Sequence, residues 1–282
     1  ASPYGVPRVQ FYNVRKDWRF LSSSQETIFD QNGENPVVTY HDYDYENAFH
    51  KNITYSEHTN SKGESVTTRM EYPSDYPSGT EMSTALFNDM VTDNVLNAVV
   101  KEETTIDNVP MGSKITNYRK EINTEGNMYL PDNVETQKAG STYNQRLNFE
   151  LYDDNGNVLQ VKQTDGPSIS YIWGYNKEYP IAKIENATYA EIAGALNITE
   201  EQLKDYNDAN LSEIDGLRNN LNLNDVMVTT YVYDPLIGVT SMTDPRGYVT
   251  TYHYDDFNRL MEVRDEDNNI LTDYEYHYRG SN

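Results

Sequence analysis

The side chains that could carry chemistry in this sequence are histidines and carboxylates, because the chain contains no cysteine. Without cysteine there is neither a thiolate nucleophile nor a disulfide. No HExxH or comparable metal-ligand spacing joins the histidines, so we expect surface positions on strands and no histidine metal site. The five histidines are His41, His50, His58, His253 and His277.

Three acidic clusters, at residues 42–44, 153–155 and 265–269, resemble pieces of calcium-binding loops. None has both the Gly at position 6 and the Glu at position 12 of an EF-hand. Asp and Asn side chains also accept hydrogen bonds from their own backbone in turns. We therefore expect these clusters to form turns, with no cofactor, and a surface Ca²⁺ site stays open as an alternative.

The composition excludes several classes of protein. A net charge of −23 opposes binding to nucleic acid. No run approaches the roughly 18 apolar residues that a membrane helix needs. The 25 tyrosines can pack half-exposed sheets without many leucines, which argues against disorder. The chain opens with neither an initiator Met nor a signal-peptide pattern, which suits a fragment of a longer protein.

A unit of about 21 residues repeats in the C-terminal part of the chain. Tyr233 and Tyr254 lie 21 residues apart, Tyr254 and Tyr276 lie 22 apart, and Tyr152 and Trp173 again lie 21 apart. In each unit a Tyr-Asp pair ends a strand, and a following Gly or Asn supplies the positive φ of a turn. Consecutive antiparallel hairpins are therefore predicted. The signature positions are Tyr152, Asp153, Gly156, Trp173, Gly174, Tyr233, Asp234, Gly238, Asp244, Gly247, Tyr254, Asp255 and Tyr276.

Alternation at the C-terminus predicts one more strand. Tyr274, Tyr276 and Tyr278 share one face, which we expect to be buried, and Asp273, Glu275 and His277 share the other. Toward the N-terminus the pattern predicts a hairpin that joins 52–58 to 64–72, a short helix over 83–92, and strands over 99–106 and 114–122.

A helical insertion interrupts the repeats. Two capping boxes, Thr188 with Glu191 and Thr199 with Gln202, begin predicted helices, and residues 212–215 begin a third. The later part of the insertion is rich in Asn, so we expect it to be hydrophilic and its structure to be only loosely specified by the sequence. We expect the insertion to decorate a hairpin loop. The predicted parts are an irregular β-rich region (1–150), repeat hairpins (151–187), the helical insertion (188–225) and C-terminal repeat hairpins (226–282).

The repeat motifs resemble the RHS/YD-repeat family, in particular its wall-associated-protein-like members in Bacteroidota. The most specific stretches are 152–158, 171–176, 179–183, 244–247 and 258–260. The resemblance implies an all-β fold in which hairpins form a curved sheet or ribbon. It also implies a very large protein that is secreted or lies at the cell surface, and that leaves the cell by the type IX pathway. Some members form a hollow shell around a C-terminal toxin.

The family also suggests an enzymatic alternative, in which paired aspartates near Asp-Pro sequences cleave the chain. Asp234 and Asp244 are the pair that such a mechanism would use. An ordinary repeat follows them, however, and Val239 stands where the family has an aromatic residue. We therefore expect no catalytic residue and no enzyme.

The leading interpretation is a structural or interaction module. Its expected partners are the rest of the ribbon and cell-surface or secretion-system proteins. Two alternatives stay open: a carbohydrate-binding module, in which exposed tyrosines would stack on glycans, and an autoproteolytic segment. The sequence identifies neither cargo nor receptor.

Overall fold

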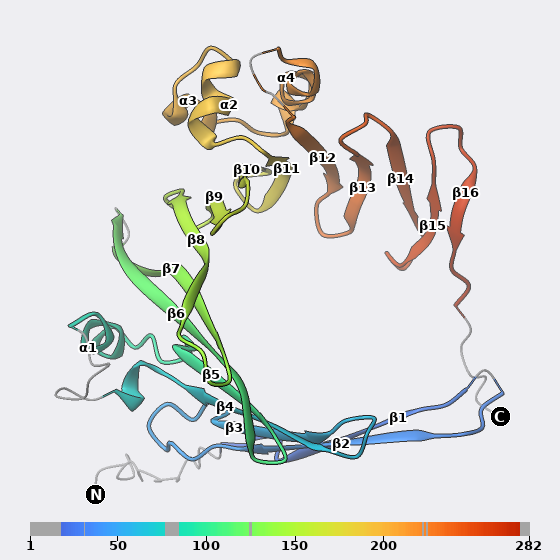
Figure 1. Cartoon of the computed structure of the whole chain (residues 1–282). Helices are drawn as coiled ribbons and strands as arrows, with labels where there is room; N and C mark the ends of the chain where they lie inside the picture. The colour runs from blue at the N-terminus through green and yellow to red at the C-terminus, as the bar shows by residue number, and fades with distance from the viewer. Residues whose placement is uncertain are drawn as a thin grey trace, which may run out of the picture. The chain divides into compact units, whose positions relative to one another are not determined.

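The structure is a computed structural model, and it describes residues 18–276 apart from 31, 77–84, 124–125, 222 and 224. Among these residues it has sixteen strands, and each is hydrogen-bonded to the strands before and after it in the chain (Figure 1). The all-β fold predicted from the sequence is confirmed. The strands are β1 Ser23–Ile28, β2 Val37–Asp44, β3 Tyr55–Thr59, β4 Ser65–Glu71, β5 Lys101–Ile106, β6 Val109–Asn123, β7 Gly126–Lys138, β8 Asn144–Tyr152, β9 Val158–Gln163, β10 Ser168–Gly174, β11 Tyr179–Glu185, β12 Met227–Asp234, β13 Gly238–Thr243, β14 Val249–Tyr254, β15 Leu260–Arg264 and β16 Ile270–Asp273.

The chain divides into two compact units. One comprises residues 1–70 and 104–110, and the other comprises 71–103 and 111–282. The four-part division drawn from the sequence pattern remains a prediction.

The first unit contains β1 to β4 as two hairpins. The predicted hairpin between 52–58 and 64–72 is present as β3 and β4, with Thr59 opposite Ser65. Along β2 the exposed fraction alternates, so that Thr39, His41 and Tyr43 lie on the more shielded face. This period of two matches the pleat of a strand with one face partly covered.

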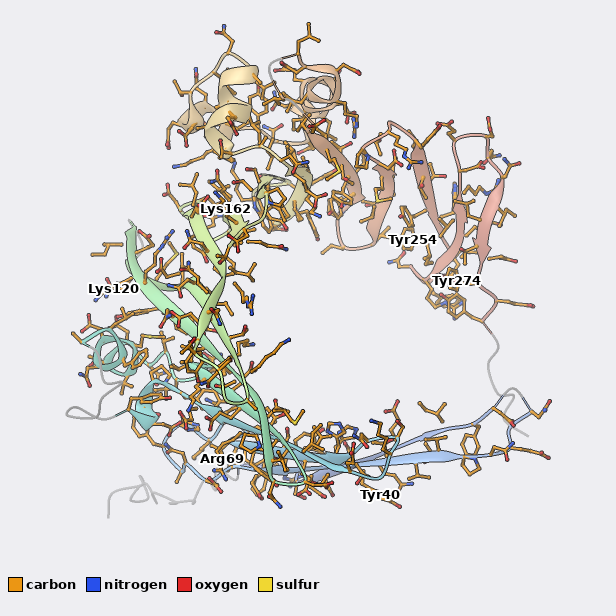
Figure 2. All side chains as sticks on the ribbon, viewed as in Figure 1. Tyr40, Arg69, Lys120, Lys162, Tyr254 and Tyr274 are labelled. Carbon is orange, nitrogen blue, oxygen red and sulfur yellow. The ribbon has the colours of Figure 1, made fainter. Side chains whose placement is uncertain are left out.

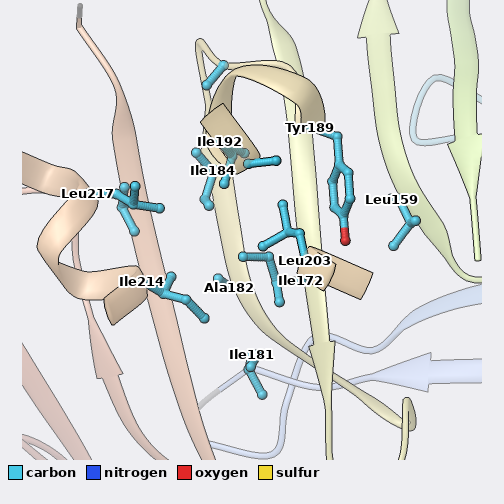
Figure 3. Packing of buried hydrophobic residues seen from close by; sticks show 13 residues of the cluster. Leu159, Ile172, Ile181, Ala182, Ile184, Tyr189, Ile192, Leu203, Ile214 and Leu217 are labelled. Atoms are coloured by element: carbon cyan, nitrogen blue, oxygen red, sulfur yellow. The ribbon is translucent and has the colours of Figure 1, made fainter. Parts of the chain in front are cut away.

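The second unit buries its largest core where three helices pack on strands β9 to β12 (Figure 3). The helices are α2 Tyr189–Ala195, α3 Glu200–Lys204 and α4 Leu211–Gly216. Thr188 and Thr199 each accept a hydrogen bond from the third residue of their helix, as the capping boxes predicted. The core side chains are Leu159, Ile172, Ile181, Ala182, Ile184, Ala187, Tyr189, Ile192, Ala193, Leu203, Ile214, Leu217 and Val228.

This core corrects the view of the insertion as a loop decoration. Ile192, Leu203 and Ile214 come from its helices and are fully buried. Leu217, in the Asn-rich later part, is also buried, with 1% of its surface exposed. Leu221, by contrast, is 96% exposed. The insertion is therefore a main source of apolar burial in this unit.

A second, smaller cluster lies around helix α1 Ala85–Thr92, which the sequence placed within 83–92. Phe87 and Met90 of the helix pack against Tyr76 and Val100. The described residues contain no helix that is long and apolar enough to cross a membrane.

The burial predicted for the tyrosines at the C-terminus is not found in Tyr274 and Tyr276. Strand β16 ends at Asp273, and Tyr274 and Tyr276 beyond it are 43% and 44% exposed. Figure 2 marks Tyr254 and Tyr274 in these last hairpins. Alternation of residue types indicates two faces, but burial also needs a layer of side chains that covers one of them. Residues 277 and 278 lie outside the described residues.

Candidate functional site

The aspartates of the repeat form the turns between strands. In the described residues, six turns share one pattern: the first residue's side-chain Oδ1 accepts the backbone N–H of the residue four positions later, at 2.8–3.1 Å. A residue with positive φ precedes that donor. This is the three-residue hairpin loop, in which a left-handed residue follows a type I turn. The turns begin at Asp30, Asn60, Asp153, Asp244, Asp255 and Asp265.

The acidic clusters at 153–155 and 265–269 therefore lie in turns, as expected. The expectation is wrong for residues 42–44, which lie at the end of strand β2. In the part of the chain that the structure describes, no group of three His, Asp or Glu side chains is arranged to hold a metal ion. The Oδ1 atoms of Asp153 and Asp265 already accept backbone N–H groups. The absence of a cofactor remains an expectation.

Hydrogen bonding lowers the pKa of Asp255 in its turn. The largest cause is the side chain of Arg259, whose Nε lies 2.8 Å from Asp255 Oδ2, and the backbone N–H groups of Arg259 and Phe257 add to it. A folded-state pKa below the ordinary value of about 3.9 stabilises the fold above that pH. This contribution is lost as the pH falls through the lower, folded-state pKa.

We expect Arg259→Ala to raise the pKa of Asp255 toward its ordinary value, because the first cause of the shift is removed. Titration of the Asp255 carboxyl by NMR measures this change. Asp265 is the control, because Asn269 lowers its pKa and Arg259 is not among the causes. An Asp255 midpoint that is the same in both proteins would contradict the assignment.

Four tyrosines of the repeat, three on strands and one just beyond a strand, each bond to the strand before it. Four hydroxyls donate to backbone carbonyls on the preceding strand, at 2.7–3.0 Å. Burial raises the pKa of Tyr152 and Tyr233 to about 12, so both hydroxyls remain protonated donors at neutral pH. The pairs are Tyr152 with Pro131, Tyr233 with Pro180, Tyr254 with Val239 and Tyr276 with Leu260.

Trp173 and Gly174 lie where the sheet meets the insertion. The indole Nε1 of Trp173 donates to the Val158 carbonyl at 2.9 Å. A Cβ at Gly174 would lie 2.6 Å from Ile181 Cγ2 and 3.1 Å from the backbone nitrogen of Asp208. The missing side chain therefore allows the insertion to approach the strand closely.

Gly238 has no room for a side chain. Its φ is +153°, and a Cβ would lie 2.5 Å from Tyr254 Oη. We expect Gly238→Ala to destabilise the protein by about 1–3 kcal/mol, measured by chemical denaturation. Gly194→Ala, in an open position of helix α2, should instead stabilise it by about 0.5–1 kcal/mol.

The Tyr254→Phe variant tests the cause of this loss, because it removes the atom that the new Cβ would meet first. The double variant, which carries Gly238→Ala and Tyr254→Phe together, should therefore lose less stability than the two single variants lose in sum. Additive losses would show that the tyrosine is not the obstacle.

Asp234 and Asp244 lie at opposite ends of β13, six residues or roughly 20 Å of strand apart. Asp244 Oδ1 accepts the backbone N–H groups of Arg246 and Tyr248. Asp234 ends β12 opposite Gly238. The structure thus does not bring the two carboxylates together, although a family mechanism would use them as a pair.

The histidines differ in their surroundings. His50 corrects the expectation of surface strand positions, since it lies in a turn and is 7% exposed, with Nδ1 accepting the backbone N–H of Asn52. His253 Nε2 lies 3.2 Å from Thr251 Oγ1 on β14. His41 and His58 are half-buried on β2 and β3. His277 is outside the described residues.

Sequence reasoning missed Arg218, whose side chain is 10% exposed and joins the insertion to the sheet. Its guanidinium donates to the carbonyls of Val228, Thr243 and Asp244 at 3.1–3.2 Å and pairs with Asp215. The signal available was its position next to Leu217, which lies three residues after Ile214 at helical spacing.

A hollow of about 360 Å³ lies on strands β6 to β8 and the turn that follows β8. Its basic group, Arg119, already donates to the Phe149 carbonyl and stacks over the Tyr152 ring, 5.0 Å from the centroid. The other lining residues are Glu121, Ile122, Met128, Glu150, Leu151, Asp153 and Asp154. Arg119 is thus engaged in holding strands together.

Comparison with known proteins identifies the repeat. Residues 238–270 match the family model described as RHS Repeat. The resemblance inferred from the motifs is confirmed, whereas the Bacteroidota-type detail remains an expectation. No curated protein matches the chain.

Solved structures with some likeness to the chain are Tc toxin components. A crystal structure of TcdB2-TccC3 is 14% identical with a TM-score of 0.32, and the match covers 83% of this chain and 12% of that one. A Photorhabdus luminescens Tc holotoxin pore with a mutated TccC3 is also 14% identical, with a TM-score of 0.30, and covers 81% and 11%. This chain spans about an eighth of the first of these.

Proposed function

We propose that this chain is a non-enzymatic structural and interaction module of a large exported protein. The premise is the match of residues 238–270 to the RHS Repeat model. One observation carries the proposal: the residues that define the repeat are used in turns and in tyrosine–carbonyl bonds. Asp153, Asp244 and Asp255 accept backbone N–H groups, and Tyr152 and Tyr254 bond neighbouring strands.

The module's expected partner is the rest of the same ribbon. Strands β1 and β16 stand at the two ends of the strand order. An edge strand presents unpaired N–H and C=O groups, to which a further strand can add. We further propose a secreted or cell-surface location, with export by the type IX pathway, as the family resemblance implies.

Amide hydrogen exchange tests the proposal. This chain is compared with a longer piece of the same protein that extends on both sides. Amides of β1 and β16 should be protected more strongly in the longer piece, whereas amides of the interior strand β13 should exchange alike in both. Equal exchange of β1 and β16 in the two proteins would refute continuation of the ribbon.

A further inference from the structure

His41 and His58 face each other across adjacent strands of the first unit. They are directly opposed residues of β2 and β3. Their ring centroids are 5.3 Å apart, and the ring planes are inclined by 30°. Within the described residues, neither imidazole has a hydrogen-bond partner, in contrast to His50 and His253. Two half-buried imidazoles therefore lie side by side with their ring nitrogens uncommitted.

The backbone holds this pair in place. Strand β2 lies between β1 and β3, and β3 lies between β2 and β4, so both histidines are on interior strands. His41 is opposite Ser24 on one side, and His58 is opposite Val66 on the other. A site on paired strands is positioned more firmly than a site on a loop, which reduces the cost of organising the ligands.

The geometry points to a divalent transition-metal site, and we propose that His41 and His58 together bind Zn²⁺ or a similar ion. Imidazole nitrogen is a favoured ligand of Zn²⁺, Cu²⁺ and Ni²⁺. A zinc ion at about 2.0–2.1 Å from one nitrogen of each ring, with a tetrahedral angle, places the ring centroids about 5 Å apart. The observed separation of 5.3 Å meets this requirement.

Two protein ligands leave coordination positions open. No third His, Asp or Glu of the described residues completes the set. The two carboxylates adjacent in sequence, Asp42 and Glu57, oppose each other one position along the strands and so lie on the other face of the sheet. Glu57 there accepts hydrogen bonds from Tyr55 and Ser65. Water or a donor from a bound partner therefore fills the remaining positions. The net charge of −23 favours the approach of a cation.

Calorimetric titration of the chain with ZnCl₂ at pH 7.5 in 0.15 M NaCl tests the site. We expect one zinc ion per chain, and His41→Gln or His58→Gln should weaken its binding about tenfold or more, since each removes one of two ligands. His253→Gln is the matched control, a strand histidine with a hydrogen-bond partner, and should leave the affinity unchanged. Circular dichroism establishes that each variant is folded.

A second measurement does not depend on the variants. In the unaltered chain, zinc should shift the imidazole NMR signals of His41 and His58 and leave that of His253 in place, and Mg²⁺ in excess should not compete. Zinc binding that is equal in all variants, or zinc that shifts neither His41 nor His58, would overturn the proposal.

Discussion

Replacing Arg218 by Met should lower the free energy of unfolding by about 3 kcal/mol. This is the lower end of the range for removing one partner of a buried ion pair, because the Asp215 side chain is 41% exposed and keeps access to water. The Arg218 side chain is 10% exposed, and its loss also removes the hydrogen bonds that it donates to the carbonyls of Val228, Thr243 and Asp244.

Chemical denaturation measures the effect, and Arg246→Met is the matched control. Arg246 is an exposed residue of the turn that begins at Asp244. A surface substitution of this kind usually changes stability by less than about 0.5 kcal/mol. Arg218→Lys should fall between the two, because an ammonium keeps the charge but lacks the planar fork of donors. Equal losses for Arg218→Met and Arg246→Met would show that the contacts add nothing.

Replacing Ile192 by Ala should cost about 2–5 kcal/mol, the usual loss for a large apolar side chain that leaves a cavity. Ile192 is fully buried between helix α2 and the sheet. Ile122→Ala on β6 makes the same chemical change at a side chain that is 77% exposed, and should cost less than about 0.5 kcal/mol. Thermal unfolding of the two variants gives the comparison.

Replacing the whole insertion by a short turn extends this test. Tyr189, Leu203, Ile214 and Leu217 would be lost together, and Ile181 and Ile184 of β11 would be exposed to water. We expect the cooperative unfolding transition of the second unit to disappear. A transition that survives with its midpoint unchanged would mean that the helices are a decoration after all.

The hairpins were predictable because their determinants are local. An Asp or Asn followed three residues later by Gly or Asn forms the same turn at Asp30, Asp153 and Asp255. The side-chain oxygen and the positive φ that the turn requires are both present within five residues of sequence. The capping boxes at Thr188 and Thr199 are local in the same sense, and both helices begin where predicted.

Features that depend on distant residues were missed. Ile214 and Leu217 stand among Asn residues, and their burial depends on strand β12, which follows later in the chain. The opposition of His41 and His58 depends on the register of two strands that are joined by a ten-residue connection. Periodicity likewise cannot tell whether another layer covers Tyr274 and Tyr276, and both are exposed.

The consecutive order of the strands bears on how the chain folds. Contacts between sequence neighbours favour rapid folding, and hairpins closed by three-residue loops can form independently of one another. The pairing of β11 with β12 differs, because residues 186–226 must first be closed into a loop. Closing so long a segment costs about 2 kcal/mol more than closing a short turn. Helix formation in that segment shortens the gap, so we expect the docking of the insertion to accompany the pairing of β11 with β12.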